Sequence, residues 1–326
     1  TSAYSFKYGT TQPHDLVARA AEFDMPALAL TDRDSFAGTI RFAKSCLEYG
    51  IAPIIGINLQ IDLVNSESVG GNSFSSESLR LSSQSDRKNF PRVTILAGSD
   101  GGYRHLMHLY RGITFTSGDR IPVITMDTLE RFSEHSSHLY LLHGPESPLS
   151  EAIGLHRPDL AMEIFNKTRP FFADQAVECV SHLVGGNGPR STAHAARSLV
   201  FAREHDIDAV VTNAVRMRDR SDGPVADVLD CARQLVPLDR RHLERRNGEG
   251  FLKSSEEMHA LAAEIARAAG EGSPRLLLKS TREWAERSLL SPQRDIGLGD
   301  VHLPEADVVG AANAADMRRV LRERSE

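Results

Sequence analysis

The sequence has few cysteines and no apolar run near the length that a membrane helix needs. Its 326 residues include three cysteines and one tryptophan, and no stretch approaches the roughly 20 consecutive apolar residues of a spanning helix. Cys46, Cys179 and Cys231 lie far apart and in no metal-ligand spacing. We therefore expect a cytoplasmic protein without disulfides. The opening residues TSAYSFKYGT have neither the basic start nor the apolar core of a signal peptide.

The sequence also lacks an excess of basic residues and several common catalytic motifs. Its formal net charge is −6, which argues against a chain whose main task is to grip nucleic acid by itself. It contains no GxGxxG after a predicted strand, no Walker A pattern and no GxSxG elbow. These absences disfavour dinucleotide binding, P-loop chemistry and an α/β-hydrolase site.

Residues 25–60 carry the clearest structural pattern. The apolar run 27–30 predicts a buried strand, 36–49 has apolar residues at helical spacings, Gly50 ends that helix, and 51–55 begins a second strand. A strand–helix–strand unit of this kind normally joins parallel strands by a right-handed crossover.

Strands and helices continue to alternate to about residue 216. Short strands are predicted at 92–97, 139–142, 176–180 and 208–212. This alternation predicts a parallel α/β sheet or barrel. Residues 65–90 are rich in serine and lack apolar periodicity, so we expect a disordered surface loop there. Beyond residue 217 the pattern is helical, which predicts an appended helical layer.

Polar side chains stand at the ends of the predicted strands, where sites form in parallel α/β folds. Histidine and carboxylate groups there are possible ligands for zinc, manganese or magnesium. The arginines oppose this, because guanidinium groups stay charged beside a divalent ion and can pair with the carboxylates instead. Both readings remain open from these residues alone. The candidate residues are Asp32, Arg33, Asp34, Asn58, His143, Glu178, His182 and Arg216.

A basic cluster follows in the helical part. It contains Arg240, Arg241, Arg245 and Arg246, which are candidate contacts for DNA phosphates. A solvated helix face, with Asp239 alongside, is the alternative reading.

Several segments resemble the PHP (polymerase and histidinol phosphatase) domain of bacterial DNA polymerase III α subunits. They are SAYSFKYG, ALALTDRDSFAGTIRFAKSCLEYGIAPIIG, RVTILAGSDGGYRHLMHL, AVVTNAVRMRDRSDGPVADVLDCARQ, GFLKSSEEM and DIGLGDVHLPE, in the family's order. The TDRD form and the VECVSH strand look most similar to the error-prone actinobacterial branch. The resemblance implies a distorted, TIM-like (β/α)7 PHP barrel at residues 1–216. A helical extension at residues 217–326 would then lead toward a polymerase palm that this chain lacks.

The resemblance also bears on metal binding. The family's histidine in TDHD corresponds to Arg33, its glutamate after PIIG to Asn58, and its closing histidine to Arg216. A family aspartate corresponds to Tyr8, and His182 alone keeps the family's ligand type. The resemblance therefore implies that the site is vestigial and holds no metal, and that arginine–carboxylate pairs cross it.

The function implied is a structural and interaction module of an error-prone polymerase, inactive on its own. The alternative is a residual metal-dependent phosphoesterase or 3′–5′ exonuclease that uses Asp32, His143, Glu178 and His182. The family further suggests a polymerase palm and thumb, DNA, a sliding clamp and translesion accessory proteins as partners, and no membrane.

Overall fold

The structure is a computed structural model. It describes residues 1–63, 90–99, 101–117, 121–132, 138–243, 245–299 and 310–325. The serine-rich loop predicted at 65–90 lies outside these ranges, apart from its last residue.

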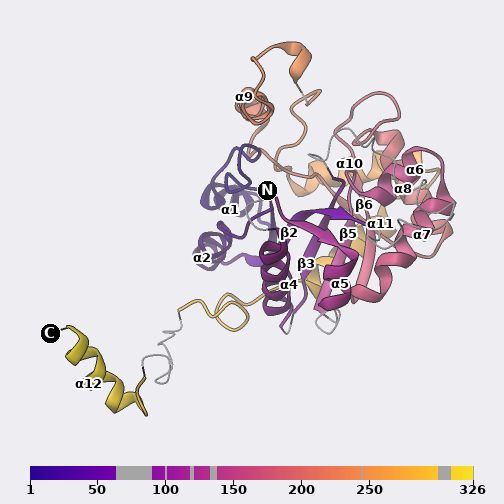
Figure 1. The fold of residues 1–326 in the computed structure, drawn as a ribbon. Coiled ribbons are helices and arrows are strands. Elements are labelled where there is room, and N and C mark those ends of the chain that lie inside the picture. The colour runs from indigo at the N-terminus through magenta and orange to yellow at the C-terminus, as the bar shows by residue number, and fades with distance from the viewer. Residues whose placement is uncertain are drawn as a thin grey trace.

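One curled, seven-stranded sheet forms the centre of the fold (Figure 1). Its strand order is β1-β2-β3-β5-β6-β7, and β4 pairs with β2. The strands are β1 (Ala27–Arg33), β2 (Ala52–Asp62), β3 (Arg92–Ala97), β4 (Val123–Thr125), β5 (Leu139–His143), β6 (Asp174–Val180) and β7 (Asp208–Thr212). In the described residues the sheet stays open between β1 and β7, so it is a half-barrel of the TIM-like PHP type.

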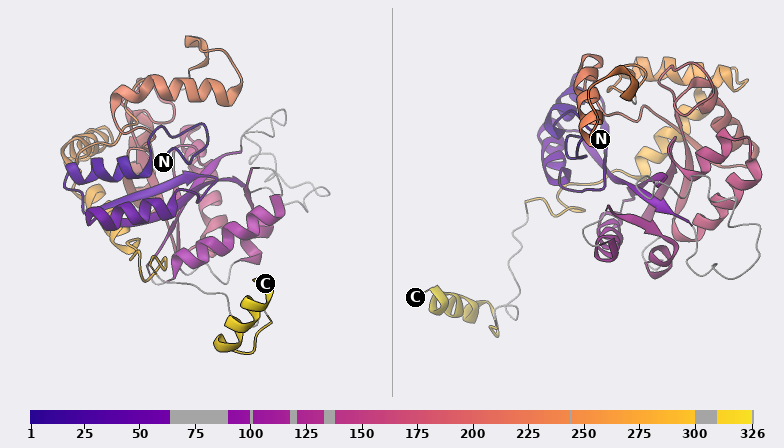
Figure 2. Two further views of the ribbon diagram at one scale, coloured as in Figure 1. Left: turned by 90° about the vertical axis from the view of Figure 1, so that its left-hand side faces the viewer. Right: turned by 45° about the horizontal axis from the view of Figure 1, so that its top comes forward.

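Most of the helices lie on the outer face of the sheet (Figures 1 and 2). The helices of the described ranges are α1 (Pro13–Glu22), α2 (Thr39–Tyr49), α4 (Gly102–Ser117), α5 (Met126–Arg131), α6 (Pro148–Gly154), α7 (Pro158–Thr168), α8 (Thr192–Glu204), α9 (Gly223–Gln234), α10 (Ser255–Ala268), α11 (Arg275–Arg287) and α12 (Ala314–Ser325). Short 3-10 turns in the described ranges are η2 (Arg169–Phe171), η3 (Arg220–Asp222) and η4 (Arg240–His242). Figure 1 shows α12 apart from the body of the sheet and α9 standing above it.

The expectation of a wholly parallel sheet is wrong at β3, which runs antiparallel to both β2 and β5. An antiparallel pair needs no crossover helix, and the sequence between β2 and β3 has no helical periodicity. This reversal matters for the site. It brings the first residue of β3, Arg92, to the edge where the neighbouring strands end.

The inner face of the sheet is filled from the helical part of the chain. The indole of Trp284, on α11, is 3% exposed and packs with Ile54, Leu142 and Val210 from three strands. The Thr281 hydroxyl accepts a hydrogen bond of 2.9 Å from the Val211 amide of β7. Since α11 both fills the half-barrel and contacts its β7 edge, this helix is part of the same core rather than only an added layer.

No helix in the described part of the chain is long and apolar enough to cross a membrane.

Candidate functional site

Polar side chains converge on the open end of the sheet, which we call the mouth. Arg33 ends β1, Asn58 lies in the same register on β2, and Arg92 begins β3. Glu178 lies near the end of β6, and Glu146 follows β5. The antiparallel β3 thus adds a third strand-end guanidinium, with Arg33 and Arg216, that the sequence pattern did not place here.

Glu146 is held by two arginines. Arg33 Nη2 donates to both Glu146 carboxylate oxygens at 2.9 and 2.8 Å, and Arg190 donates to one of them. Burial alone would raise the pKa of Glu146, but the charges of Arg33, Arg190 and Arg92 outweigh it and lower this pKa to about 2. Glu146 is therefore ionised at neutral pH, and its charge is already compensated.

Arg92 makes a second paired group. Its Nε donates to Asn58 Oδ1 at 2.6 Å, and its Nη2 donates to Asp34 Oδ1 at 2.6 Å and to the Asn58 carbonyl at 2.8 Å. Asp34 has a left-handed backbone with φ of 58°, which turns the chain sharply after β1. The turn brings the Asp34 carboxylate within reach of β3.

Arg216 pairs away from the strand-end carboxylates. Its Nη1 and Nη2 donate to the two Asp230 carboxylate oxygens at 3.0 and 2.9 Å, and Asp230 is fully buried. The ring of Tyr8 lies between two guanidinium groups, 4.1 Å from that of Arg216 and 3.5 Å from that of Arg33. Arginine–carboxylate pairing is present as expected. However, the partners of Arg33 and Arg216 are Glu146 and Asp230, not Asp32, Asp34 or Glu178.

Asp32 is buried and engaged by the residues that precede helix α1. Its oxygens accept hydrogen bonds from the Ser2 hydroxyl at 2.7 Å, the Ser5 hydroxyl at 2.8 Å, and the Ser2 amide. These three donors orient the carboxylate toward the N-terminal loop. Asp32 therefore stabilises that loop.

His143 lies apart from the mouth, on the outer face of the sheet. Its imidazole is 1% exposed, its Nε2 donates to Gln175 Oε1 at 2.8 Å, and it packs near Phe165 of α7. Burial lowers its pKa to about 4, so it is neutral at pH 7. Strand alternation explains the placement: His143 follows Leu139 and Leu141 on the helix-covered face.

His182 and Glu178 do face the mouth region. His182 Nε2 donates to the Asn213 carbonyl at 2.9 Å, and burial lowers the pKa of His182 to about 4. Glu178 accepts a hydrogen bond from Thr212 at 2.5 Å, and burial raises its pKa. Each carries one hydrogen bond that fixes its orientation.

The resemblance to the PHP family implies a cluster of metal ions at the mouth. In the described ranges no group of three or more histidine, cysteine, aspartate or glutamate side chains is placed to hold a metal ion. Guanidinium groups cannot ligate a metal, and they occupy the mouth beside Glu146 and Asp34. The donor set there does not fit a cluster of divalent ions.

The basic cluster is partly neutralised. Arg245 donates to Asp227 at 2.6 Å, and Arg241 pairs with Asp239 at 3.1 Å. Arg240 and Arg246 have exposed side chains. Contact with DNA phosphates by these residues stays a prediction.

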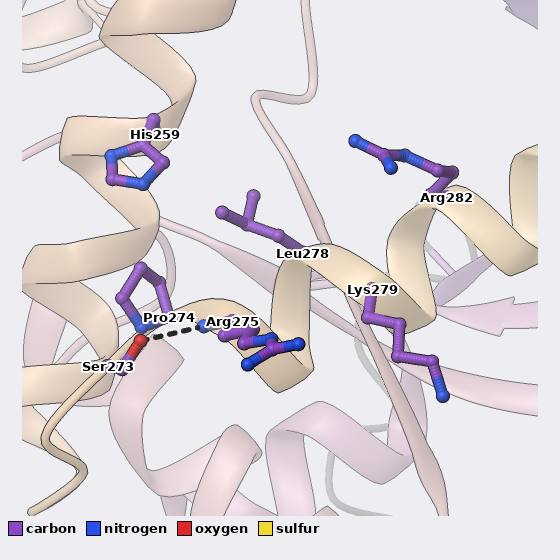
Figure 3. A pocket seen from close by; sticks show the side chains of 7 residues that line it. All are labelled: His259, Ser273, Pro274, Arg275, Leu278, Lys279 and Arg282. Carbon is purple, nitrogen blue, oxygen red and sulfur yellow. Dashed lines mark hydrogen bonds between the residues drawn. The ribbon is translucent and has the colours of Figure 1, made fainter.

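A pocket away from the mouth opens between α10 and α11 (Figure 3). Its volume is about 400 Å³, and it is lined by His259, Ser273, Pro274, Arg275, Leu278, Lys279 and Arg282. Lys279 pairs with Glu283 at 3.3 Å. Because its basic side chains are exposed surface groups, the pocket does not form a defined site.

Sequence reasoning missed Arg92, Glu146, Arg190, Asp230 and Tyr8 as members of the paired network. Only Tyr8 had a signal, since the resemblance implies that it takes the position of a family aspartate. The others reach the mouth through the reversal of β3, two loops and the placement of α9, which local patterns do not encode.

Comparison with known proteins places this geometry in a family. The model of the PHP domain family matches residues 1–182. DNA polymerase III subunit alpha of Escherichia coli K12 is 27% identical over 322 residues, covering 93% of this chain and 23% of the relative. The error-prone DNA polymerase of Nocardia farcinica is 48% identical over 60 residues, covering 18% of this chain and 5% of the relative. That of Corynebacterium efficiens is 32% identical over 120 residues, covering 37% and 9%.

Where the match is long, the chain spans about a fifth of the relative's length, as with the α subunit of Buchnera aphidicola at 21%. Among solved structures, an amidohydrolase from Chromobacterium violaceum is 14% identical with a TM-score of 0.34, covering 63% of this chain and 83% of that one. That likeness is too slight to carry an argument. The family match covers more than half of the chain, so this chain belongs to the PHP domain family, with homology to DNA polymerase III α subunits and error-prone DNA polymerases.

Proposed function

We propose that this chain is the N-terminal PHP domain of an error-prone, DNA polymerase III α-like enzyme and acts there as a structural and interaction module. DNA-directed DNA synthesis and damage tolerance would belong to the whole enzyme. The homology to polymerase subunits supports the first part. The observation that carries the second is the pairing of Arg33 with Glu146 and of Arg92 with Asp34 across the mouth.

The physical reason is electrostatic. A divalent ion needs deprotonated oxygen or neutral nitrogen donors, and each guanidinium beside it would repel it. Here the arginines supply the positive charge that metals would otherwise bring to the mouth carboxylates. We therefore propose that the domain binds no zinc, manganese or magnesium and that its mouth is vestigial.

Metal analysis tests the proposal. The purified chain, incubated with excess zinc or manganese and then dialysed, should retain well under one ion per chain by mass spectrometry of the elements. It should also release no phosphate from a model phosphomonoester and no nucleotide from a 3′-labelled primer. One or more ions per chain, lost on His182→Ala substitution, would contradict it.

A residual phosphoesterase or 3′–5′ exonuclease is the second candidate, and the position of His182 and Glu178 at the mouth favours it. His143 and Asp32 would not take part, given their contacts with Gln175, Ser2 and Ser5. This candidate requires a chelator-sensitive activity that His182→Ala abolishes. Substitution of His156→Ala, an exposed histidine, is the matched control and should have no effect.

The proposed partners follow from the same homology. They are the palm and thumb of the polymerase, DNA, a sliding clamp and translesion accessory proteins, in the cytoplasm. Binding of primer–template by Arg240 and Arg246 would fall steeply with salt concentration.

A further inference from the structure

Helix α9 turns its charged side inward. Asp230 is fully buried and Asp227 is 8% exposed, and both carboxylates pair with arginines beneath the helix, Arg216 and Arg245. Arg233, on the same side, also reaches Asp230 at 3.0 Å. The polar pairs, together with Ala226 and Cys231, form the buried face of this helix.

The opposite side of α9 is apolar and faces solvent. Val225 and Val228 are 51% and 52% exposed, Leu229 is half-buried and Ala232 is exposed. These four residues, which we call the α9 stripe, recur at spacings of three and four and therefore share one face of the helix. Figures 1 and 2 show this helix standing clear of the sheet and of the other helices.

Helix α10 shows the opposite arrangement, because it buries Leu261 and Ile265 and exposes Glu256 and His259. Apolar side chains stabilise a fold when they leave water, so the exposed α9 stripe contributes no such free energy to this chain alone. Contiguous exposed apolar surface of this kind marks an interaction site.

Exposed arginines close to α9 in the chain indicate the charge of the partner. The exposed Arg240 follows the C-terminal end of α9, and the exposed Arg246 follows Arg245, which donates to the Gly223 carbonyl at the first turn of α9. Exposed basic side chains therefore lie on the segment that follows α9 in the chain. A second copy of this chain would bring the same charges together, which disfavours self-association.

We propose that the α9 stripe binds an amphipathic helix of another protein whose apolar face is flanked by aspartate or glutamate. Apolar burial would provide the affinity and the arginines the orientation, as in helix-in-groove recognition. This inference does not depend on whether the mouth binds metal.

The test uses two labelled, synthetic helical peptides with the same leucine stripe. One carries glutamate at the flanking positions and the other carries lysine. In fluorescence anisotropy, the 326-residue chain should bind the glutamate peptide more tightly. The double variant Val225→Ser/Val228→Ser should weaken binding about tenfold, since two apolar side chains leave the interface. Leu155→Ser, at a residue 53% exposed elsewhere on the surface, is the control and should leave binding unchanged.

Charge reversal gives a second, independent readout. Arg240→Glu/Arg246→Glu should weaken the glutamate peptide and strengthen the lysine peptide. Because all substituted side chains are exposed, each variant should keep the far-ultraviolet circular dichroism of the parent chain. Equal affinity for both peptides, unchanged binding by the serine variant, a stable dimer in sedimentation, or stripe-dependent binding to phosphatidylglycerol vesicles would each overturn the proposal.

Discussion

The guanidinium carbon of Arg33 lies 3.5 Å from the centre of the Tyr8 ring. At this distance the cation sits directly on the aromatic face, where the ring quadrupole attracts it. The guanidinium carbon of Arg216 lies 4.1 Å from the centre of the same ring. One aromatic side chain therefore separates two like charges that would otherwise repel each other across the mouth.

Replacing Tyr8 should show how much this ring contributes. Tyr8 is 7% exposed, so Tyr8→Ala should lower the free energy of unfolding by about 3 kcal/mol through the cavity and the lost cation–π contacts. Tyr8→Phe keeps the ring and should cost less than about 1 kcal/mol. Urea unfolding measures both, and similar losses in the two variants would show that the ring itself is not the stabilising part.

The Arg216–Asp230 pair should show strong coupling. Arg216→Ala leaves a fully buried carboxylate that still pairs with Arg233 and should cost about 3 kcal/mol of unfolding free energy. The double variant Arg216→Met/Asp230→Leu removes both charges and should be markedly more stable than the single variant. A double-mutant cycle from urea unfolding gives the coupling. Additive effects would mean that the two groups do not interact appreciably.

Stability should fall in acid in two steps. The pKa of His143 is about 4 in the folded chain and 6.5 as its ordinary value, so the unfolded state binds more protons between these pH values. The free energy of unfolding should therefore decrease as pH falls from 6.5 to 4, by about 3 kcal/mol for this residue. The pKa of His182 is lowered to about 4 as well, so His143→Gln should reduce the slope of this part of the curve of unfolding free energy against pH, and the remaining slope should come from His182.

The second step belongs to Glu146. Its pKa of about 2, against an ordinary 4.5, means that its ion pairs contribute fully above pH 4.5 and are lost as pH falls toward 2. Glu146→Gln should be less stable at neutral pH and should lose less stability than the parent chain below pH 4.5. An unchanged slope in this range would contradict the ionised pair with Arg33 and Arg190.

A substitution at Trp284 should show whether the sheet and helix α11 unfold as one unit. Because its ring fills the inside of the sheet, Trp284→Ala should lower the free energy of unfolding by about 4 kcal/mol. Leu276→Ala, 74% exposed on the same helix, should change it by less than about 0.5 kcal/mol. If Trp284→Ala left the sheet as stable as before, residues beyond 217 would form a separate unit, as the sequence pattern suggested.

Local patterns predicted most of the strands because apolar runs and their turn signals lie within a few residues of each other. The strand at 92–97 was predicted, for example, and matches β3. The direction of β3 was not predicted, because it depends on the path of the chain between β2 and β3. Strand alternation also decided that His143 points outward, although it ends its strand in the same way as residues that face the mouth.

The sequence by itself determined the α/β class and the family. These depend on residue identity and on short-range periodicity, which one chain displays directly. Only the tertiary structure decided which carboxylate each arginine meets. Glu146 lies 113 residues from Arg33 along the chain, and Asp230 lies 14 residues from Arg216. Each charge meets its partner through the packing of elements, not through spacing along the chain. The same holds for α9, whose pattern is amphipathic but whose outward face was fixed by the buried ion pairs beneath it.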